Sequence, residues 1–245
     1  MYKFRVKIIS VLFTAAVFGQ LNASELPALD EKYEKLFEDL LTEKITSGEM
    51  AEELASLEMY ITDPVEMAGL FNFTGIILFY TGSQDAAVEK FESALDILEN
   101  LDDDKAAGSK YYRLFADVIS QLASVRGPLF KIKWAGKIMD YAGKAIELDS
   151  SDISARLTLL NYYFHAPGIA GGSGKKAIDG IRELADEYQE NKINRYLVFL
   201  WSAVFHYQNG QTAEARKYLA SAYQLYPDNI WTRNFLSSYG INPED

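Results

Sequence analysis

Residues 71–98 read FNFTGIILFYTGSQDAAVEKFESALDIL, and the rest of the chain repeats or decorates this stretch. Apolar and small residues recur three or four positions apart on either side of a central turn, which is typical of two amphipathic helices. Gly75 and Ala87 would let the two helix backbones approach closely, while Phe71 and Phe91 would fill the space beside them. The stretch therefore predicts a helical hairpin.

The spacing of small and large residues in this hairpin, with Gly82 at its turn, resembles the tetratricopeptide repeat, whose period is about 34 residues. Residues 196–229 match the same pattern, through Phe199, Ala203, Gly210, Ala215, Leu219 and Ala222. Because one such unit cannot bury its own apolar face, further copies are expected along the chain.

Helical patterns and turn residues divide the chain into such copies. Pro64 blocks the continuation of the helix before it, and Pro128 favours a helix start. Helices are expected at about 29–44, 47–60, 109–125, 128–148, 153–165 and 175–190. The predicted units are 29–62, 68–101, 107–150, 153–190 and 196–229, with a cap at 229–239 in which Trp231 and Phe235 close the last groove. The resemblance thus implies an all-α fold over residues 24–245, a right-handed α-solenoid of TPR-like helical hairpins with a C-terminal capping helix.

The first 23 residues have the three parts of a secretory signal peptide. An uncharged, mostly apolar run at 8–19 precedes a small-residue cleavage pattern at 21–23, and the positive start consists of Lys3, Arg5 and Lys7. The alternative is a membrane anchor that stays in place, although the apolar run is short for a span of about 20 residues. We expect cleavage after residues 1–23 and a periplasmic or secreted mature protein.

Charge and cysteine content narrow the classes of partner. The formal net charge is −11 and no basic cluster occurs along the chain, so we expect no nucleic-acid partner, since phosphate binding needs a Lys/Arg surface. The chain has no cysteine, which excludes disulfides, thiolate metal sites and a cysteine-linked lipid anchor. A hydrophobic content of 49% indicates a folded core.

A long loop interrupts the fourth unit between Pro167 and Gly174. A phosphate-binding loop would need a Ser or Thr after the Gly-Lys pair, and Lys176 stands there instead. The segment with Pro167, Gly171 and Gly172 is read either as a helix-breaking turn or as a lid over a groove. This loop resembles one in the periplasmic T-component proteins associated with TRAP transporters. That resemblance implies an accessory protein that meets a substrate-binding protein and has a hydrophobic cavity.

Sequence signals for chemistry are weak. Neither His165 nor His206 has a His or acidic partner at metal-ligand spacing, and no G-x-S-x-G nucleophile motif occurs. The acidic run 102–104 lacks the alternating ligands of a calcium loop. We therefore expect no catalytic residues, no metal site and no cofactor.

In tetratricopeptide proteins the first helix of each unit lines a concave groove, so the resemblance implies a set of groove residues. They are Asn72, Ile76, Phe79, Tyr112, Leu157, Asn161, Phe164, Leu200, Val204 and Tyr207. These side chains are mostly aliphatic or aromatic, and each could contribute about 1.5–3 kcal/mol to an apolar ligand. The alternative is that tight packing fills the groove and these residues belong to the core.

The function expected from these features is non-enzymatic. It is a periplasmic binding or scaffold module that holds a protein partner, a peptide or an apolar small molecule. Two alternatives stay open, an envelope scaffold without a small-molecule ligand and an enzyme with a site under the 167–174 loop. The sequence leaves the oligomeric state undetermined.

Overall fold

The computed structural model describes residues 27–101, 108–187 and 191–242. All regular structure within these ranges is helical. The α-helices are α1 (Pro27–Leu41), α2 (Ser47–Leu57), α3 (Pro64–Tyr80), α4 (Gln84–Glu99), α5 (Ser109–Val125), α6 (Pro128–Leu148), α7 (Ile153–His165), α8 (Gly174–Glu187), α9 (Lys192–Gln208), α10 (Thr212–Leu225) and α11 (Ile230–Ser238), with 3-10 turns at Glu58–Tyr60 and Gly168–Ala170. The expected all-α class is thus confirmed.

The signal peptide expected at 1–23 and the acidic turn at 102–104 lie outside the described residues. In the described ranges, no helix combines the length and the apolar character that crossing a membrane requires.

Local signals account for most helix boundaries. Five helices of the described ranges are capped by a side-chain oxygen that accepts a hydrogen bond from a backbone N–H in the first turn. The capping residues of α2, α3, α7, α9 and α11 are, in that order, Thr46, Asp63, Asp152, Asn191 and Asn229. Proline occupies the first turn of α3 and of α6, where its missing N–H has no cost. The helices expected at 109–125, 128–148 and 153–165 have the expected bounds.

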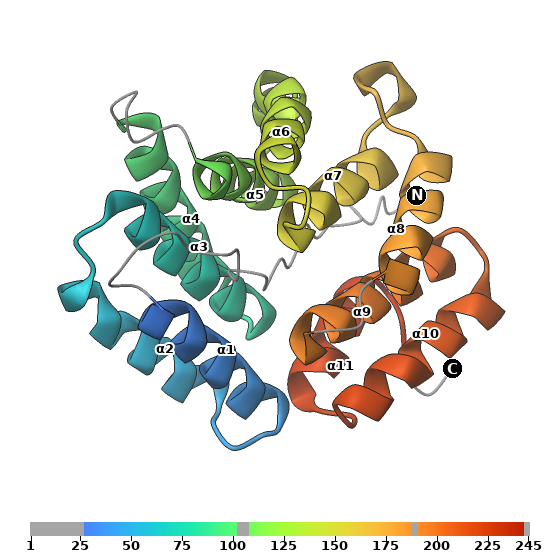
Figure 1. The fold of residues 1–245 in the computed structure, drawn as a ribbon, viewed down its shortest axis with the longest axis horizontal. Coiled ribbons are helices and arrows are strands. Elements are labelled where there is room, and N and C mark those ends of the chain that lie inside the picture. Colours follow the sequence, from blue (N-terminus) through green and yellow to red (C-terminus); the bar gives the residue numbers. More distant parts are fainter. Residues whose placement is uncertain (1–26, 102–107, 188–190, 243–245) are drawn as a thin grey trace, which may run out of the picture.

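Successive helices pack as antiparallel neighbours, α3 with α4, α5 with α6, α7 with α8 and α9 with α10 (Figure 1). Gly82 and Gly210, both at positive φ, form the turns of the first and last of these pairs. Within α3·α4 the ring of Phe91 packs directly against Gly75, so the missing side chain at this position makes room for the aromatic ring.

The first helices of the pairs also contact one another. Lys110 on α5 forms an ion pair with Glu66 on α3, and Asp117 on α5 accepts a hydrogen bond from Thr158 on α7. Arg113 on α5 contacts Asp152 at the start of α7, and Asp117, one turn further along α5, contacts Thr158 on α7. The two helices therefore run parallel to each other.

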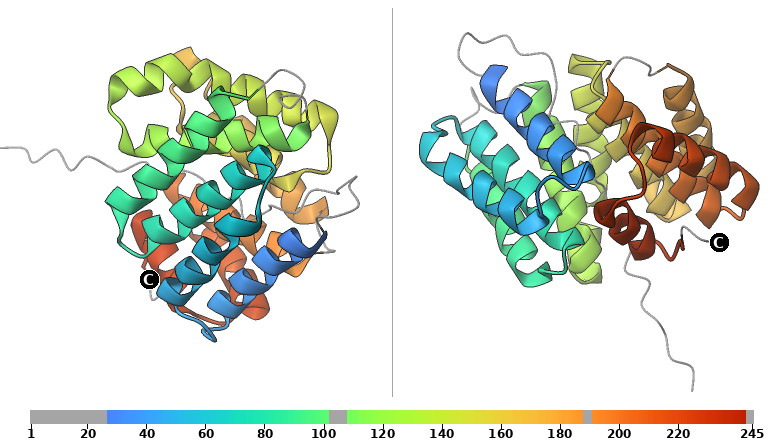
Figure 2. Two further views of the ribbon diagram at one scale, coloured as in Figure 1. Left: turned by 90° about the vertical axis from the view of Figure 1, so that its left-hand side faces the viewer. Right: turned by 90° about the horizontal axis from the view of Figure 1, so that it is seen from below.

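The two ends of the described chain meet, which the sequence analysis did not anticipate. The centroid of the Trp231 ring on α11 lies 5.2 Å from that of Phe37 on α1 and 5.7 Å from that of Tyr80 on α3. Phe235 on the same helix lies 5.3 Å from Trp201 on α9. The helix expected as a cap, α11, therefore also joins the last helix pair to α1 and α3 (Figures 1 and 2).

The Gly75–Phe91 contact gives a stability prediction. A methyl group at Gly75 would lie 2.6 Å from the nearest Phe91 ring carbon, and Phe91 is fully buried. We expect Gly75→Ala to lower the free energy of unfolding by about 1–3 kcal/mol through overpacking, as measured by urea denaturation.

Gly69 on the same helix is the matched control. A methyl group there would sit 3.5 Å from Leu114, an ordinary contact, so Gly69→Ala should raise stability by up to about 1 kcal/mol through helix propensity. Equal effects of the two substitutions would contradict the assigned α3·α4 packing.

Candidate functional site

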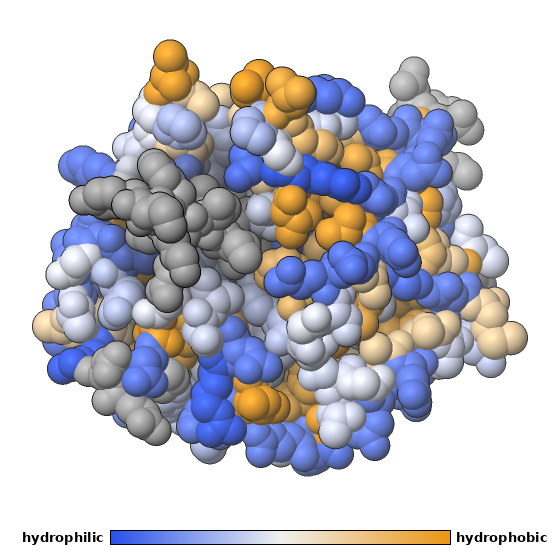
Figure 3. All heavy atoms as spheres, turned by 180° about the vertical axis from the view of Figure 1, so that it is seen from behind, coloured by the Kyte–Doolittle hydropathy of each residue, from blue (hydrophilic) through white to orange (hydrophobic). Residues whose placement is uncertain are grey.

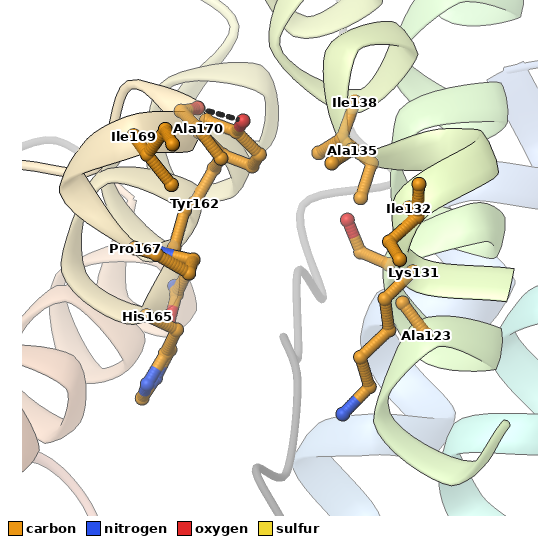
Figure 4. Close-up of a pocket in the computed structure, with 13 residues that line it drawn as sticks. Ala123, Lys131, Ile132, Ala135, Ile138, Tyr162, His165, Pro167, Ile169 and Ala170 are labelled. Atoms are coloured by element: carbon orange, nitrogen blue, oxygen red, sulfur yellow. Dashed lines mark hydrogen bonds between the residues drawn. The ribbon is translucent and has the colours of Figure 1, made fainter. Parts of the chain in front are cut away.

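The main cavity lies where α5, α6 and α7 meet the segment that follows α7, and its volume is about 480 Å³. Ile132, Ala135 and Ile138 on α6 face Pro167, Ile169 and Ala170 across the space (Figure 4). Most of the lining is aliphatic. The position and character of the cavity fit an apolar molecule of modest size.

The wall after α7 is built by local chain chemistry. Pro167 follows the last turn of α7, and the Tyr162 hydroxyl donates a hydrogen bond to the Ala170 carbonyl (Figure 4). Gly171 takes a positive φ of 88°. A side chain at Gly172 would collide with the Ala166 carbonyl at 1.7 Å, so this position requires glycine.

These contacts locate the three residues expected to form a lid. Pro167 lines the cavity, whereas Gly171 and Gly172 shape the turn that carries the wall and do not line it. Ser173 N–H donates to the Tyr163 carbonyl at 2.7 Å, which ties the end of the segment back to α7. The segment is therefore a hydrogen-bonded wall of the cavity in this conformation.

The expected groove residues lie mostly in the interior. Tyr112, Phe164 and Tyr207 are half-buried, and the rest of that set is buried, namely Asn72, Ile76, Phe79, Leu157, Asn161, Leu200 and Val204. Phe164, for example, stacks on Phe205 with ring centroids 4.5 Å apart. Helix packing around the closed end of the chain thus occupies much of the surface where a groove was expected.

Asn161 is the member of that set that lines the main cavity. Phe79 instead lines a second, more polar hollow of about 420 Å³ between the C-terminal end of α3 and α11. The structure therefore does not gather the expected groove residues into one open site.

An exposed apolar rim at the main cavity was missed by the sequence analysis. Ile132 on α6 is 77% exposed and Ile169 on the opposite wall is fully exposed, while Leu129, one turn before Ile132, is 83% exposed. Apolar patches also interrupt the hydrophilic surface on the back of the molecule (Figure 3). The sequence did contain a signal for this rim. Leu129 and Ile132 are apolar but lie off the helical stripe by which α6 packs against α5.

A buried ion pair holds α5 beside the start of α7. Arg113 Nε lies 3.0 Å from Asp152 Oδ2, without the alignment of a hydrogen bond. Arg113 Nη1 lies 3.9 Å from Asp117 Oδ2. Burial raises the pKa of Asp152, and the charge of Arg113 and the Ala155 N–H oppose that effect. This pairing helps to hold α5 against α7 on the N-terminal side of Ser120 and Asn161, which line the cavity.

Polar groups below the 167–170 segment include Ser120 and His165, the residue types of a nucleophile and a base. Neither Ser120 Oγ nor His165 Nε2 has a hydrogen-bond partner among the described residues, so they do not form a nucleophile–base pair. Burial lowers the pKa of His165 to about 4, which makes it a weak base at neutral pH. No acidic residue lines the cavity within the described chain.

Across residues 27–101, 108–187 and 191–242, no group of three or more His, Asp or Glu side chains could hold a metal ion. The cavity is therefore suited to binding through apolar contact and a few neutral hydrogen-bonding groups.

Comparison with known proteins gave no match, either among models of protein families or among curated proteins.

The low pKa of His165 predicts an acid-sensitive fold. Between pH 6.5 and pH 4 the unfolded chain binds a proton at this residue that the folded protein does not, so stability falls as the pH falls through this window. From pH 7.5 to pH 5 this loss amounts to about 2 kcal/mol. Urea denaturation at the two pH values measures this loss. Between them, the free energy of unfolding of His165→Gln should fall by about 2 kcal/mol less than that of the unmodified protein. An equal pH dependence in both proteins would contradict the buried, neutral state of His165.

Proposed function

We propose that this protein is a non-enzymatic binding protein that holds an apolar small molecule between α6 and the segment 166–170. The observation that supports this most is an aliphatic cavity of about 480 Å³ with a rim of exposed isoleucines. Exposed aliphatic side chains on facing walls gain free energy when a ligand covers them, at about 25 cal/mol per Å² of apolar surface. Preformed apolar pockets with few polar groups are the usual form of small-molecule sites.

The finer architecture is part of the proposal. We infer a right-handed α-solenoid of TPR-like units, because antiparallel pairs follow one another and their first helices contact side by side. The packing of Phe91 over Gly75, two residues that carry the resemblance to the repeat, supports this inference. The contact of α11 with α1 and α3 would close such an array on itself.

The cellular setting follows from the sequence. The features of residues 1–23 support export and a periplasmic or secreted mature chain. The likeness of the 167–174 loop to that of TRAP-associated T-component proteins supports a role as a transporter accessory, with a substrate-binding protein as partner. The exposed rim is suited to transient contact with such a partner, since apolar patches of this kind mark interaction surfaces.

Ala135→Trp tests the binding proposal. Ala135 points into the cavity from α6 (Figure 4), so an indole there should fill the space and reduce binding of the apolar fluorophore N-phenylnaphthylamine at least tenfold. Ala86→Trp is the control, because Ala86 is exposed on α4 and does not line the cavity.

Native mass spectrometry of the mature chain, purified without detergent, gives an independent measurement. An apolar mass carried by the unmodified protein and by Ala86→Trp but not by Ala135→Trp supports the proposal. If the fluorophore binds all three proteins equally and no small mass is carried, the cavity is not a ligand site and the scaffold alternative replaces it.

A further inference from the structure

We propose that the cavity selects apolar molecules that carry a hydroxyl group, through an unsatisfied polar floor formed by Ser120 on α5 and Asn161 on α7. This inference names the ligand class for the proposed function and rests on it. It follows from the pattern of polar contacts between α5 and α7.

Polar residues form successive rungs along the parallel helices α5 and α7. Arg113 meets Asp152 at the first rung, and Asp117 accepts a hydrogen bond from Thr158 at the second. Three residues further along each helix come Ser120 and Asn161, on the same helix faces because residues three apart lie one turn on. The first rung is an ion pair and the second a hydrogen bond within the protein, whereas the residues of the third line the cavity.

The free atom of Asn161 is an acceptor. Its Nδ2 donates to the Leu157 carbonyl at 3.0 Å, which fixes the amide orientation, since the Oδ1 atom could not bond to a carbonyl oxygen. Oδ1 then has no donor within the described ranges, although the residue is only 2% exposed. Because this acceptor already lacks a partner, a ligand that donates a hydrogen bond to it gains affinity over one of equal size that cannot donate.

Ser120 complements this acceptor. Its hydroxyl has no hydrogen-bond partner in the part of the chain that the structure describes, and the residue is 1% exposed. A serine hydroxyl can donate as well as accept. A ligand hydroxyl can donate to Asn161 Oδ1, and Ser120 Oγ adds a second hydrogen-bonding group, also free within the described chain, to the same lining.

The same geometry disfavours an ionised carboxylate. A carboxylate offers only acceptor atoms, and one placed at this floor would oppose the Oδ1 atom of Asn161. The neighbouring His165 is a neutral imidazole at neutral pH because burial lowers its pKa to about 4. Lys131 is the cationic residue of the lining, and it lies with His165 at one end of the cleft, away from Ile169 and Ala170 (Figure 4).

The test compares three ligands of equal chain length. Octanol carries a donor, octyl methyl ether keeps the oxygen but cannot donate, and octanoate at pH 8 is charged and cannot donate. Each displaces bound N-phenylnaphthylamine from the unmodified protein. We expect octanol to act at an about tenfold lower concentration than the ether, the effect of one additional net hydrogen bond.

Two variants test whether Asn161 and Ser120 cause the preference for octanol over the ether. Asn161→Leu removes the acceptor at similar size, and the ratio of ether to octanol concentrations should fall to about one. Ser120→Ala should reduce the ratio without abolishing it. Ser120→Ala should not lower the melting temperature, because the Ser120 hydroxyl has no partner to lose in the described structure. Asn161→Leu also removes the bond from Nδ2 to the Leu157 carbonyl, so its melting temperature should fall slightly and its ligands are compared well below that temperature.

The outcomes separate this inference from the function it rests on. If all three ligands fail to displace the fluorophore, or the fluorophore does not bind, both proposals are wrong. Equal action of octanol and the ether in the unmodified protein overturns the hydroxyl preference alone, and water at the floor would produce that result. Tighter binding of octanoate than of octanol also overturns it, and would assign the polar contact to Lys131.

Discussion

The guanidinium of Arg113 is buried between two carboxylates, and the arrangement of the central helices depends on this contact. A buried charge is strongly unfavourable unless it is paired, so α5 must keep Arg113 against Asp117 and Asp152 in the folded state. Asp152 also caps α7, which ties the start of that helix to the same contact. The relative position of α5 and α7 is therefore specified by charge as well as by apolar packing.

The cavity begins where the polar contacts between α5 and α7 end. Beyond Thr158 the two helices present Ser120 and Asn161, whose Oγ and Oδ1 atoms have no hydrogen-bond partners within the described residues. The space beside them is bounded by α6 and the 166–170 segment. Elsewhere aromatic packing fills the interior, as where Trp231 on α11 lies against Phe37 and Tyr80. The same chain thus closes one part of its inner surface and leaves another open.

Local signals predicted the helices but not the site. Pro128 at the start of α6 and Gly82 at the α3–α4 turn act on neighbouring residues only, so their effect is visible in the sequence. The contact of Phe37 with Trp231 joins residues at opposite ends of the chain, and no periodic pattern encodes it. Ile76 and Leu200, which were expected in an open groove, are buried instead. Asn161 was among the expected groove residues, whereas Ser120 was not, since its place in the cavity depends on the register of α5 against α7.

The coupling free energy between Arg113 and Asp152 tests this account most directly. Urea denaturation of Arg113→Met, Asp152→Asn and the double variant measures it. We predict that Arg113→Met alone costs about 3–5 kcal/mol, because it leaves buried carboxylates unpaired. The double variant should be more stable than the sum of the single effects predicts, by about 1–3 kcal/mol. Effects that add to within about 0.5 kcal/mol would mean that the two groups do not interact, and would contradict the assigned contact of α5 with α7.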